Sequence, residues 1–243
     1  MNSMLMIIFA VLGLACVFPM SMILNRMPAR CFCDYNEAPE ERHNAPRITS
    51  RQKAVCSVIL AAVFSLIANR FGCTVQSAAL CLLCVTLMMI ALSDLRYCII
   101  PDELLIAAAV FAVIQTIPGI IEAQNLRDRL SPLTGALLGA GIIFAINLLG
   151  RILYKKDALG MGDLKLMAVC GIACGDVGIV IGLFAGILTA GFWFAAGMAL
   201  KRVRSDEYLP LGPFLVAGTV FFICFQPAVE RLLAWYISLI HII

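Results

Sequence analysis

Two aspartates, Asp94 and Asp163, stand where long apolar stretches end or begin, a placement suited to acid–base chemistry. Asp94 follows the apolar run 71–93, and Asp163 comes shortly before the run 166–200. Two carboxyl groups in one site cannot both ionise easily, so they share a proton, and one acts as the base while the other acts as the acid. Such a pair can activate water for attack on a peptide carbonyl without a metal ion or a covalent intermediate.

The local sequence also allows a simpler role for Asp163. The glycine-rich stretch 159–162 frees the backbone just before it, and an aspartate at a helix start is favoured as an N-cap by the exposed amides and the helix dipole. Spacing alone leaves both roles open. Pro101 separates Asp94 from Asp102, so we expect Asp94 to end one helix and Asp102 to begin the next.

The histidines and cysteines do not indicate another kind of catalytic site. The two histidines, His43 and His241, lie in a polar loop and at the C-terminal end, which argues against a Ser-His-Asp triad or a zinc–histidine site. Nine of the eleven cysteines lie in or beside apolar runs, so we expect small buried hydrophobic residues rather than disulfides. Cys31 and Cys33 lie in a polar stretch, where one C-x-C is a weak metal signal.

The elements that position the two aspartates are predicted to lie in a membrane. The chain has 243 residues, of which 62% are hydrophobic and 14% charged, and its mean hydropathy is +0.98. A soluble domain is about 45–50% apolar and about 25% charged, so this composition excludes a disordered chain, a nucleic-acid-binding protein and a water-soluble enzyme. We therefore predict an all-α polytopic membrane protein.

Charge-free runs of about 20 residues, enough to cross a bilayer as a helix, predict about eight transmembrane helices. The run 166–200 is long enough for two, with Gly175 and Asp176 as the turn between them. The other runs are 1–25, 54–69, 71–93, 104–121, 131–150 and 208–229. The first is predicted to be a retained helix rather than a signal peptide, and the stretch 232–243 either ends the last helix or lies at the membrane interface. We divide the chain into a two-helix region, 1–73, with a short loop at 26–53, and a six-helix core, 74–243.

The basic residues indicate which loops face the cytoplasm. With eight spans, the loops alternate between two sides, which hold fourteen and four Lys and Arg residues. The fourteen are Arg26, Arg30, Arg42, Arg47, Arg51, Lys53, Arg96, Arg151, Lys155, Lys156, Lys165, Lys201, Arg202 and Arg204, and the four are Arg70, Arg127, Arg129 and Arg231. The positive-inside rule places the larger set, the loop 26–53 and both aspartates on the cytoplasmic side, with both termini outside.

Glycines at regular spacing predict where helices pack closely. Gly135 and Gly139 form one G-x-x-x-G step, and Gly178, Gly182 and Gly186 form two that overlap. In lipid, such steps let helix backbones approach each other.

Several short motifs resemble those of the type IV prepilin peptidases, a family of intramembrane aspartyl proteases of the GxGD type. The most specific is the stretch 160–166, whose sequence GMGDLKL resembles the signature G-x-G-D-x-K-L. Asp94 followed by the I-P-D of residues 100–102 resembles a second motif. The G-P-F at 212–214 and the L-N and P of residues 23–28 resemble two more, in the family's order. Eight spans is also the family's full-length count.

The resemblance implies a site and an activity. Asp94 and Asp163 would be the catalytic pair, and Gly160 and Gly162 would shape the loop that presents Asp163. Members of the family remove the short basic leader of prepilins and pseudopilins, cutting after a glycine at the cytoplasmic face of the bacterial cytoplasmic membrane. Proteolysis of this kind needs no cofactor and no metal.

Three further residues of these motifs are expected to support the site. Pro101 and Asp102 match the I-P-D. Lys165 lies two residues after Asp163, where its ammonium group could favour the ionised carboxylate, meet an acidic group of the substrate or anchor the helix at the interface.

The first cytoplasmic loop departs from the family's pattern. Many members also methylate the new N-terminus with S-adenosylmethionine, and these carry two C-x-x-C pairs in a long first loop. Here the loop is short and holds only Cys31 and Cys33, so a four-cysteine metal site cannot be built from it. We predict no metal, and leave open a methyltransferase activity with S-adenosylmethionine as its cofactor.

Other functions give different expectations for the aspartates. A small ion-coupled or proton-coupled transporter would place acidic groups near the middle of its spans, whereas Asp94 and Asp163 are predicted at span edges. A noncatalytic membrane scaffold would tolerate the loss of both carboxyl groups. The expected partners are prepilin substrates and the lipid bilayer, not nucleic acid. The motifs leave open a role in pili, type II secretion or DNA uptake, and the oligomeric state.

Overall fold

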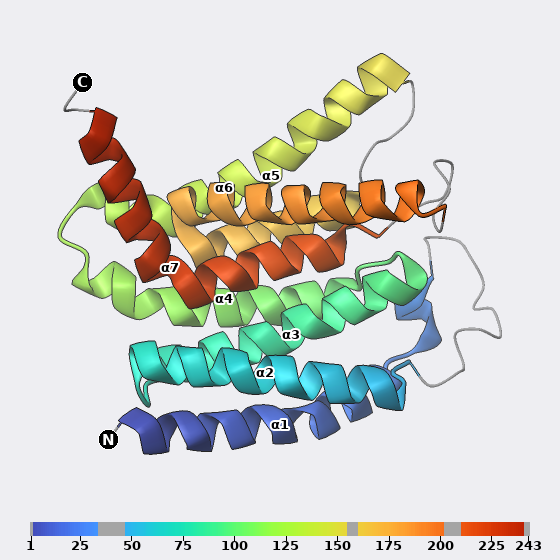
Figure 1. The fold of residues 1–243 in the computed structure, drawn as a ribbon, viewed down its shortest axis with the longest axis horizontal. Coiled ribbons are helices and arrows are strands. Elements are labelled where there is room, and N and C mark those ends of the chain that lie inside the picture. Colours follow the sequence, from blue (N-terminus) through green and yellow to red (C-terminus); the bar gives the residue numbers. More distant parts are fainter. Residues whose placement is uncertain (1, 34–46, 155–159, 202–209, 241–243) are drawn as a thin grey trace.

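The computed structural model describes residues 2–33, 47–154, 160–201 and 210–240 (Figure 1). Within these ranges the chain is helical and contains no β-strand, which confirms the predicted all-α class. The elements are α1 (Asn2–Arg26), the short 3-10 helix η1 (Ala29–Phe32), α2 (Ser50–Phe71), α3 (Val75–Tyr97), α4 (Asp102–Glu122), α5 (Leu126–Tyr154), α6 (Met161–Ala199) and α7 (Gly212–Ile240). Figure 1 shows α1 to α4 lying roughly side by side, with α5, α6 and α7 packed above them.

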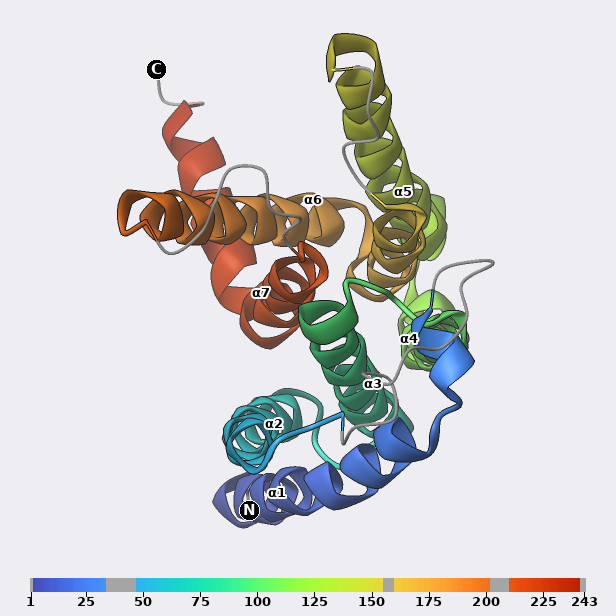
Figure 2. The ribbon, with the colours of Figure 1, turned by 90° about the vertical axis from the view of Figure 1, so that its right-hand side faces the viewer.

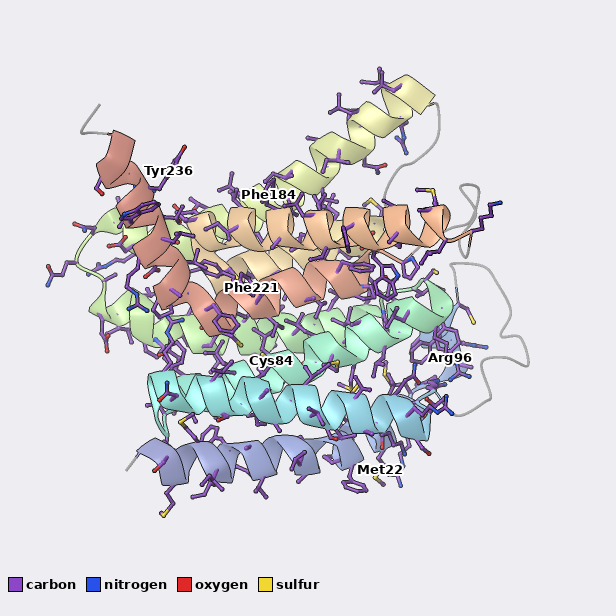
Figure 3. All side chains as sticks on the ribbon, in the orientation of Figure 1. Met22, Cys84, Arg96, Phe184, Phe221 and Tyr236 are labelled. Carbon is purple, nitrogen blue, oxygen red and sulfur yellow. The ribbon has the colours of Figure 1, made fainter. Side chains whose placement is uncertain are left out.

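Seven of the described helices are long and apolar enough to cross a membrane, so the chain is a multi-pass membrane protein. Large apolar side chains cover the outside of the bundle; Phe184, labelled in Figure 3, is 62% exposed. In water such a surface would be unfavourable, whereas lipid tails accept it.

Helix α6 explains why seven continuous helices replace the predicted eight. Its backbone is interrupted at Gly175, whose φ of 72° and ψ of −174° are not helical. A positive φ of this kind favours glycine. The chain reverses there: Asp176 contacts Ser131 near the start of α5, whereas Gly186 lies against Phe214 at the start of α7. The predicted turn is therefore correct, and the sixth and seventh predicted spans are the two arms of α6.

Local motifs set the ends of the helices that carry the aspartates. The α3 helix begins with a capping box in which Thr74 and Ser77 exchange side-chain and backbone hydrogen bonds. It ends before Cys98, which takes a left-handed φ of 54°. Pro101 is the N-cap of α4, so Asp102 is its first residue, as predicted. Asp94 and Asp102 consequently lie on different helices.

Close backbone contacts between helices occur at the predicted glycine steps. A Cβ atom at Gly171 of α6 would overlap the carbonyl oxygen of Gly135 on α5. Gly182 and Gly218 meet in the same way between the second arm of α6 and α7. The prediction that these glycines permit tight packing is confirmed.

The last helix, α7, bends between Phe221 and Tyr236, the two residues labelled on it in Figure 3. Pro227 lies inside this segment and, lacking an N–H, leaves the carbonyl of Ile223 without its helical donor. Arg70 of α2 supplies the missing donor: its guanidinium donates to Ile223 O at 3.2 Å and to Gln226 Oε1 at 2.9 Å. The residues after Pro227 continue α7 to Ile240. Of the two predictions for the stretch 232–243, that it ends the last helix is confirmed for residues 232–240.

Figure 1 places the ends of α1, α3 and α5 and the starts of α2, α4, α6 and α7 at one end of the molecule. The basic residues assigned to the cytoplasmic side therefore gather at that end, insofar as they are described. Five of the fourteen lie outside the described residues, as do both histidines and residues 34–46 of the loop 26–53. The five are Arg42, Lys155, Lys156, Arg202 and Arg204.

The expectation that nine cysteines are buried is confirmed for four of them, Cys56, Cys81, Cys84 and Cys170, whereas Cys16, Cys174 and Cys224 are half-buried. It is wrong for Cys73 and Cys98, which are exposed because they lie in the turns after α2 and α3 rather than inside a helix. All eleven cysteines are free thiols, as predicted.

Candidate active site

Asp94 lies in the last turn of α3 and is held by the first residue of α7. Its side chain is 6% exposed, and its Oδ2 atom accepts a hydrogen bond from the Gly212 N–H at 2.9 Å. Figure 2 looks onto this end of the bundle, where the end of α3 and the start of α7 lie side by side. The two residues are 118 positions apart in the sequence.

Asp163 is the third residue of α6, and the suggestion that it is the N-cap is wrong. Gly160 takes the N-cap position, with an extended backbone of φ −75° and ψ 154°. From the third position a carboxylate can reach back to the N-cap, and Asp163 does interact with the Gly160 backbone. Its side chain is 9% exposed and lies close enough to Asp94 for the two charges to interact. The fold thus brings the two predicted aspartates together.

Among the described residues, no cation pairs with either aspartate, Asp94 or Asp163. Ionising a buried carboxyl group without a cationic partner is costly, so two such groups side by side resist carrying two negative charges. A shared proton is the state that this arrangement favours.

Lys165 does not point to Asp163 but pairs with the aspartate of the neighbouring motif. Its Nζ lies 2.7 Å from Asp102 Oδ1, and both side chains are 46% exposed. The pair joins the start of α6 to the start of α4. The predicted roles of Lys165, toward Asp163, toward an acidic group of the substrate or as an interface anchor, stay predictions, and no spacing in the sequence indicated a contact 63 residues apart.

Gly162 packs the start of α6 against the turn between α3 and α4. A Cβ atom at Gly162 would lie 3.1 Å from Ile100 Cβ, tighter than ordinary side-chain contacts. Pro101 fixes the same turn from the other side as the N-cap of α4. The two residues therefore set the approach of α6 to α3, and with it the approach of the aspartates.

A buried arginine, missed in the sequence, ties the segment after α1 to the end of α3. Arg47 is 6% exposed; its backbone N–H donates to Asn25 Oδ1 at 2.8 Å, and its guanidinium donates to Leu24 O. The guanidinium also lies over the Phe32 ring, 4.3 Å from the centroid, and Phe32 packs on Tyr97, three residues after Asp94. Asn25, which belongs to the motif at residues 23–28, is the residue that could have indicated such a contact.

Comparisons with known proteins indicate one family. Residues 81–195, which contain both aspartates, match the sequence model of the type IV leader peptidase family. Over these residues the chain is similar to that family. Several curated relatives bear the name prepilin leader peptidase/N-methyltransferase.

Three of these relatives show how much of the chain is shared. The protein from Bacillus subtilis (strain 168) is 26% identical over 165 residues, which cover 67% of this chain and 62% of the relative. The protein from Xanthomonas campestris pv. campestris is 31% identical over 160 residues, 63% of this chain and 52% of the relative. The protein from Pseudomonas aeruginosa is 25% identical over 155 residues, with shares of 63% and 52%. The chain thus spans between about half and about three fifths of these relatives, and no solved structure matches it.

The thiols of Cys31 and Cys33, in the segment after α1, face different partners. Cys31 Sγ donates to Glu103 Oε1 at 3.2 Å, whereas Cys33 Sγ donates to Ala29 O at 3.3 Å. Burial, together with the Glu103 carboxylate, raises the pKa of Cys31 to about 11, which keeps it a thiol. Among the described residues, no group of three or more His, Cys, Asp or Glu side chains is arranged to hold a metal ion.

A cavity of about 170 Å³ lies at the opposite end of the bundle from the leader peptidase motifs. Arg70, Gln76, Gln115 and Gln226 supply its polar lining. Gln76 is 18 residues before Asp94 on α3, which separates them by roughly 27 Å along the helix. The cavity is therefore not part of the aspartate site.

Proposed function

We propose that this chain is a membrane-embedded aspartyl endopeptidase that removes the leader of prepilin-like proteins, with Asp94 and Asp163 as its catalytic pair. The observation that carries the proposal is the meeting of two buried carboxyl groups from α3 and α6 without a cationic partner among the described residues. Similarity to the leader peptidase family over residues 81–195 supports the substrate class.

The chemistry follows from one shared proton. The ionised carboxylate takes a proton from a water molecule while the water oxygen attacks the peptide carbonyl. The protonated carboxyl group first donates a hydrogen bond to the carbonyl oxygen, and a proton then passes to the leaving amine as the C–N bond breaks. At the end the pair again holds one proton, so no cofactor is consumed. Methylation of the new N-terminus with S-adenosylmethionine would be a separate step.

The proposed location is the bacterial cytoplasmic membrane, with the active site facing the cytoplasm. The ratio of fourteen to four basic residues between the two sides supports this orientation. Reporter fusions at Lys53, Arg127 and Lys201 test it. Lys53 and Lys201 should report the cytoplasm and Arg127 the opposite side, and an external Lys201 would contradict the orientation.

The transporter alternative fits the position of the aspartates less well. Asp94 lies in the last turn of α3 and Asp163 in the first turn of α6, so both carboxyl groups are near helix ends rather than at mid-span. A transporter would be expected to hold its ion-binding acids near the middle of the bundle.

Coexpression with a candidate prepilin, followed by mass spectrometry of the prepilin N-terminus, tests the proposal. The unmodified chain should release the leader, and Asp94→Asn or Asp163→Asn should leave it attached while the protein remains folded in the membrane. Asp176→Asn is the matched control, since Asp176 lies at the turn between the two arms of α6, away from the aspartate pair. Full cleavage by either of the first two variants would refute the proposal. The same spectra report methylation of the new N-terminus.

A further inference from the structure

The first turn of α7 has one backbone donor to spare, and it is given to Asp94. The Leu211 carbonyl accepts from Phe214 N at 3.0 Å and from Leu215 N at 3.2 Å. Pro213 has no N–H. The Gly212 N–H is therefore the donor of this turn that no helix carbonyl receives, and it reaches Asp94 Oδ2 at 2.9 Å.

The two aspartates differ in how their own helices treat a negative charge. Asp163 lies in the first turn of α6, where the exposed N–H groups and the helix dipole favour an anion. Asp94 lies in the last turn of α3, where the free carbonyls and the dipole disfavour one. Asp94 therefore needs support from another element, and α7 places its positive end there.

We propose that the Gly212–Pro213 turn is a positioning element of the active site, which holds the Asp94 carboxyl group in one orientation and stabilises its ionised form. This inference rests on the proposed proteolytic function. Bonding Oδ2 to Gly212 leaves Oδ1 for a water molecule or for the proton shared with Asp163. Gly212 acts through Asp94 and does not itself touch substrate.

The position admits no side chain. A Cβ atom at Gly212 would lie 2.7 Å from Asp94 Oδ2 and 3.1 Å from its Cγ, so alanine would force the carboxyl group or the start of α7 to move. Glycine is thus required for close approach to a carboxylate.

Other charged groups lie near Asp94, at the starts of α6 and α4. Asp163 on α6 lies near enough to Asp94 for the two charges to interact. The Lys165–Asp102 pair joins the starts of α6 and α4 at the same end. Among the described residues, the Gly212 N–H of α7 donates the hydrogen bond to the Asp94 side chain.

The sharpest experiment removes the Gly212 N–H; it also weakens the Leu211 carbonyl as the acceptor of Phe214 N and Leu215 N, so thermal unfolding of the variant is measured beside its activity. Replacing Gly212 with glycolic acid by nonsense suppression converts the backbone amide to an ester, which removes the donor without adding a side chain. Cleavage of a synthetic prepilin peptide is measured as kcat and KM across pH in purified protein. We expect kcat to fall at least about tenfold with KM within about threefold, because the lost bond serves the reacting carboxylate rather than the substrate.

The pH profile separates positioning from mere damage. Without the donor, Asp94 is harder to ionise, so the acid limb of kcat should move to higher pH by about 1 unit. Gly191→Ala, which has open space around its Cβ, is the control that should leave both kcat and the limb unchanged.

The possible outcomes distinguish the two proposals. An ester variant with wild-type kcat and an unmoved acid limb overturns the role of Gly212 while leaving the peptidase intact. Absence of cleavage by the unmodified chain overturns the proposed function itself. Gly212→Ala is a second test: a folded protein with the same loss of kcat supports the role, and one with full activity contradicts it.

Discussion

At one end of the bundle, Asp94 and Asp163 lie buried beside each other, and neither forms an ion pair with a described residue. At the other end, Arg70 and Asp176 each have several partners. Arg70 donates to Ile223 O and Gln226 across the bend of α7. Asp176 accepts from Ser131 Oγ at 3.0 Å and from Val177 N at 2.8 Å, and it lies 3.6 Å from an Arg127 nitrogen.

The difference separates charges that hold helices together from the charges that we propose to do chemistry. Arg70 joins α2 to α7, and Asp176 joins α5 to the turn of α6, so each lowers the free energy of the fold through its hydrogen bonds. The aspartate pair has one bond of this kind, from the Gly212 N–H of α7 to Asp94 Oδ2, and a buried carboxyl group without a cation is costly to ionise. We therefore expect substitutions of Arg70 and Asp176 to lower stability more than activity. Substitutions of Asp94 and Asp163 should lower activity more than stability.

Arg70→Met should produce the largest loss of stability. It removes the donors to Ile223 O and Gln226 but keeps an apolar stem, and we expect the free energy of unfolding to fall by about 2 kcal/mol. Thermal unfolding in detergent measures this. Pro227→Ala restores a helical N–H for Ile223, so Arg70→Met should cost about half as much in that background. Equal costs in both backgrounds would contradict the proposed role of Arg70 at the bend.

Asp176→Ala should have the next largest effect. It removes an acceptor from the start of the second arm of α6 and a partner of Ser131, and a loss of about 1 kcal/mol is typical for a helix-start aspartate. Arg127→Ala is the matched control; its side chain is 80% exposed, so its loss should change stability by less than about 0.5 kcal/mol. A larger effect from Arg127 would mean that the ion pair, not the backbone contact, stabilises this turn.

The Lys165–Asp102 pair should contribute less. Both side chains are about half exposed, and each single substitution to alanine should lower the free energy of unfolding by less than about 1 kcal/mol. The charge-reversed pair, Lys165→Asp with Asp102→Lys, should recover part of that loss. If the double variant is less stable than both singles, the ion pair is not the source of the effect.

Asp94→Asn and Asp163→Asn should have the smallest effect on stability. Asparagine keeps the shape and removes a buried group that resists ionisation, so the free energy of unfolding should change by less than about 1 kcal/mol or increase. Thermal unfolding at neutral pH measures this. A loss of several kcal/mol would show that the aspartates hold the fold, which would remove the contrast between the two ends.

Features tied to local sequence were predictable. Apolar runs gave the helices, Gly175 gave the turn in α6, and Pro101 gave the start of α4. The candidate aspartates were found because each lies at the end of such a run, although their meeting in space required the fold. The N-cap alternative for Asp163 failed because Gly160 already takes that position.

Contacts between distant segments could not be predicted from one sequence. The Gly212 N–H reaches Asp94, Arg70 reaches Ile223, and these pairs are 118 and 153 residues apart. Their geometry depends on how helices pack, which hydrophobic spacing does not encode. The lost donor at Pro227 was visible in the sequence, but nothing indicated that its replacement comes from α2.

The most direct test of the central claim, that Asp94 and Asp163 form one proteolytic unit, is kcat for a synthetic prepilin peptide with purified protein. Asp94→Asn and Asp163→Asn should each lower kcat by about 10³-fold, and the double variant should be no slower than either single variant, because residues that act as a unit are not additive. Asp176→Asn should stay within about threefold of the unmodified chain. A single variant that keeps more than about a tenth of kcat, or a double variant that multiplies the two losses, would contradict the claim.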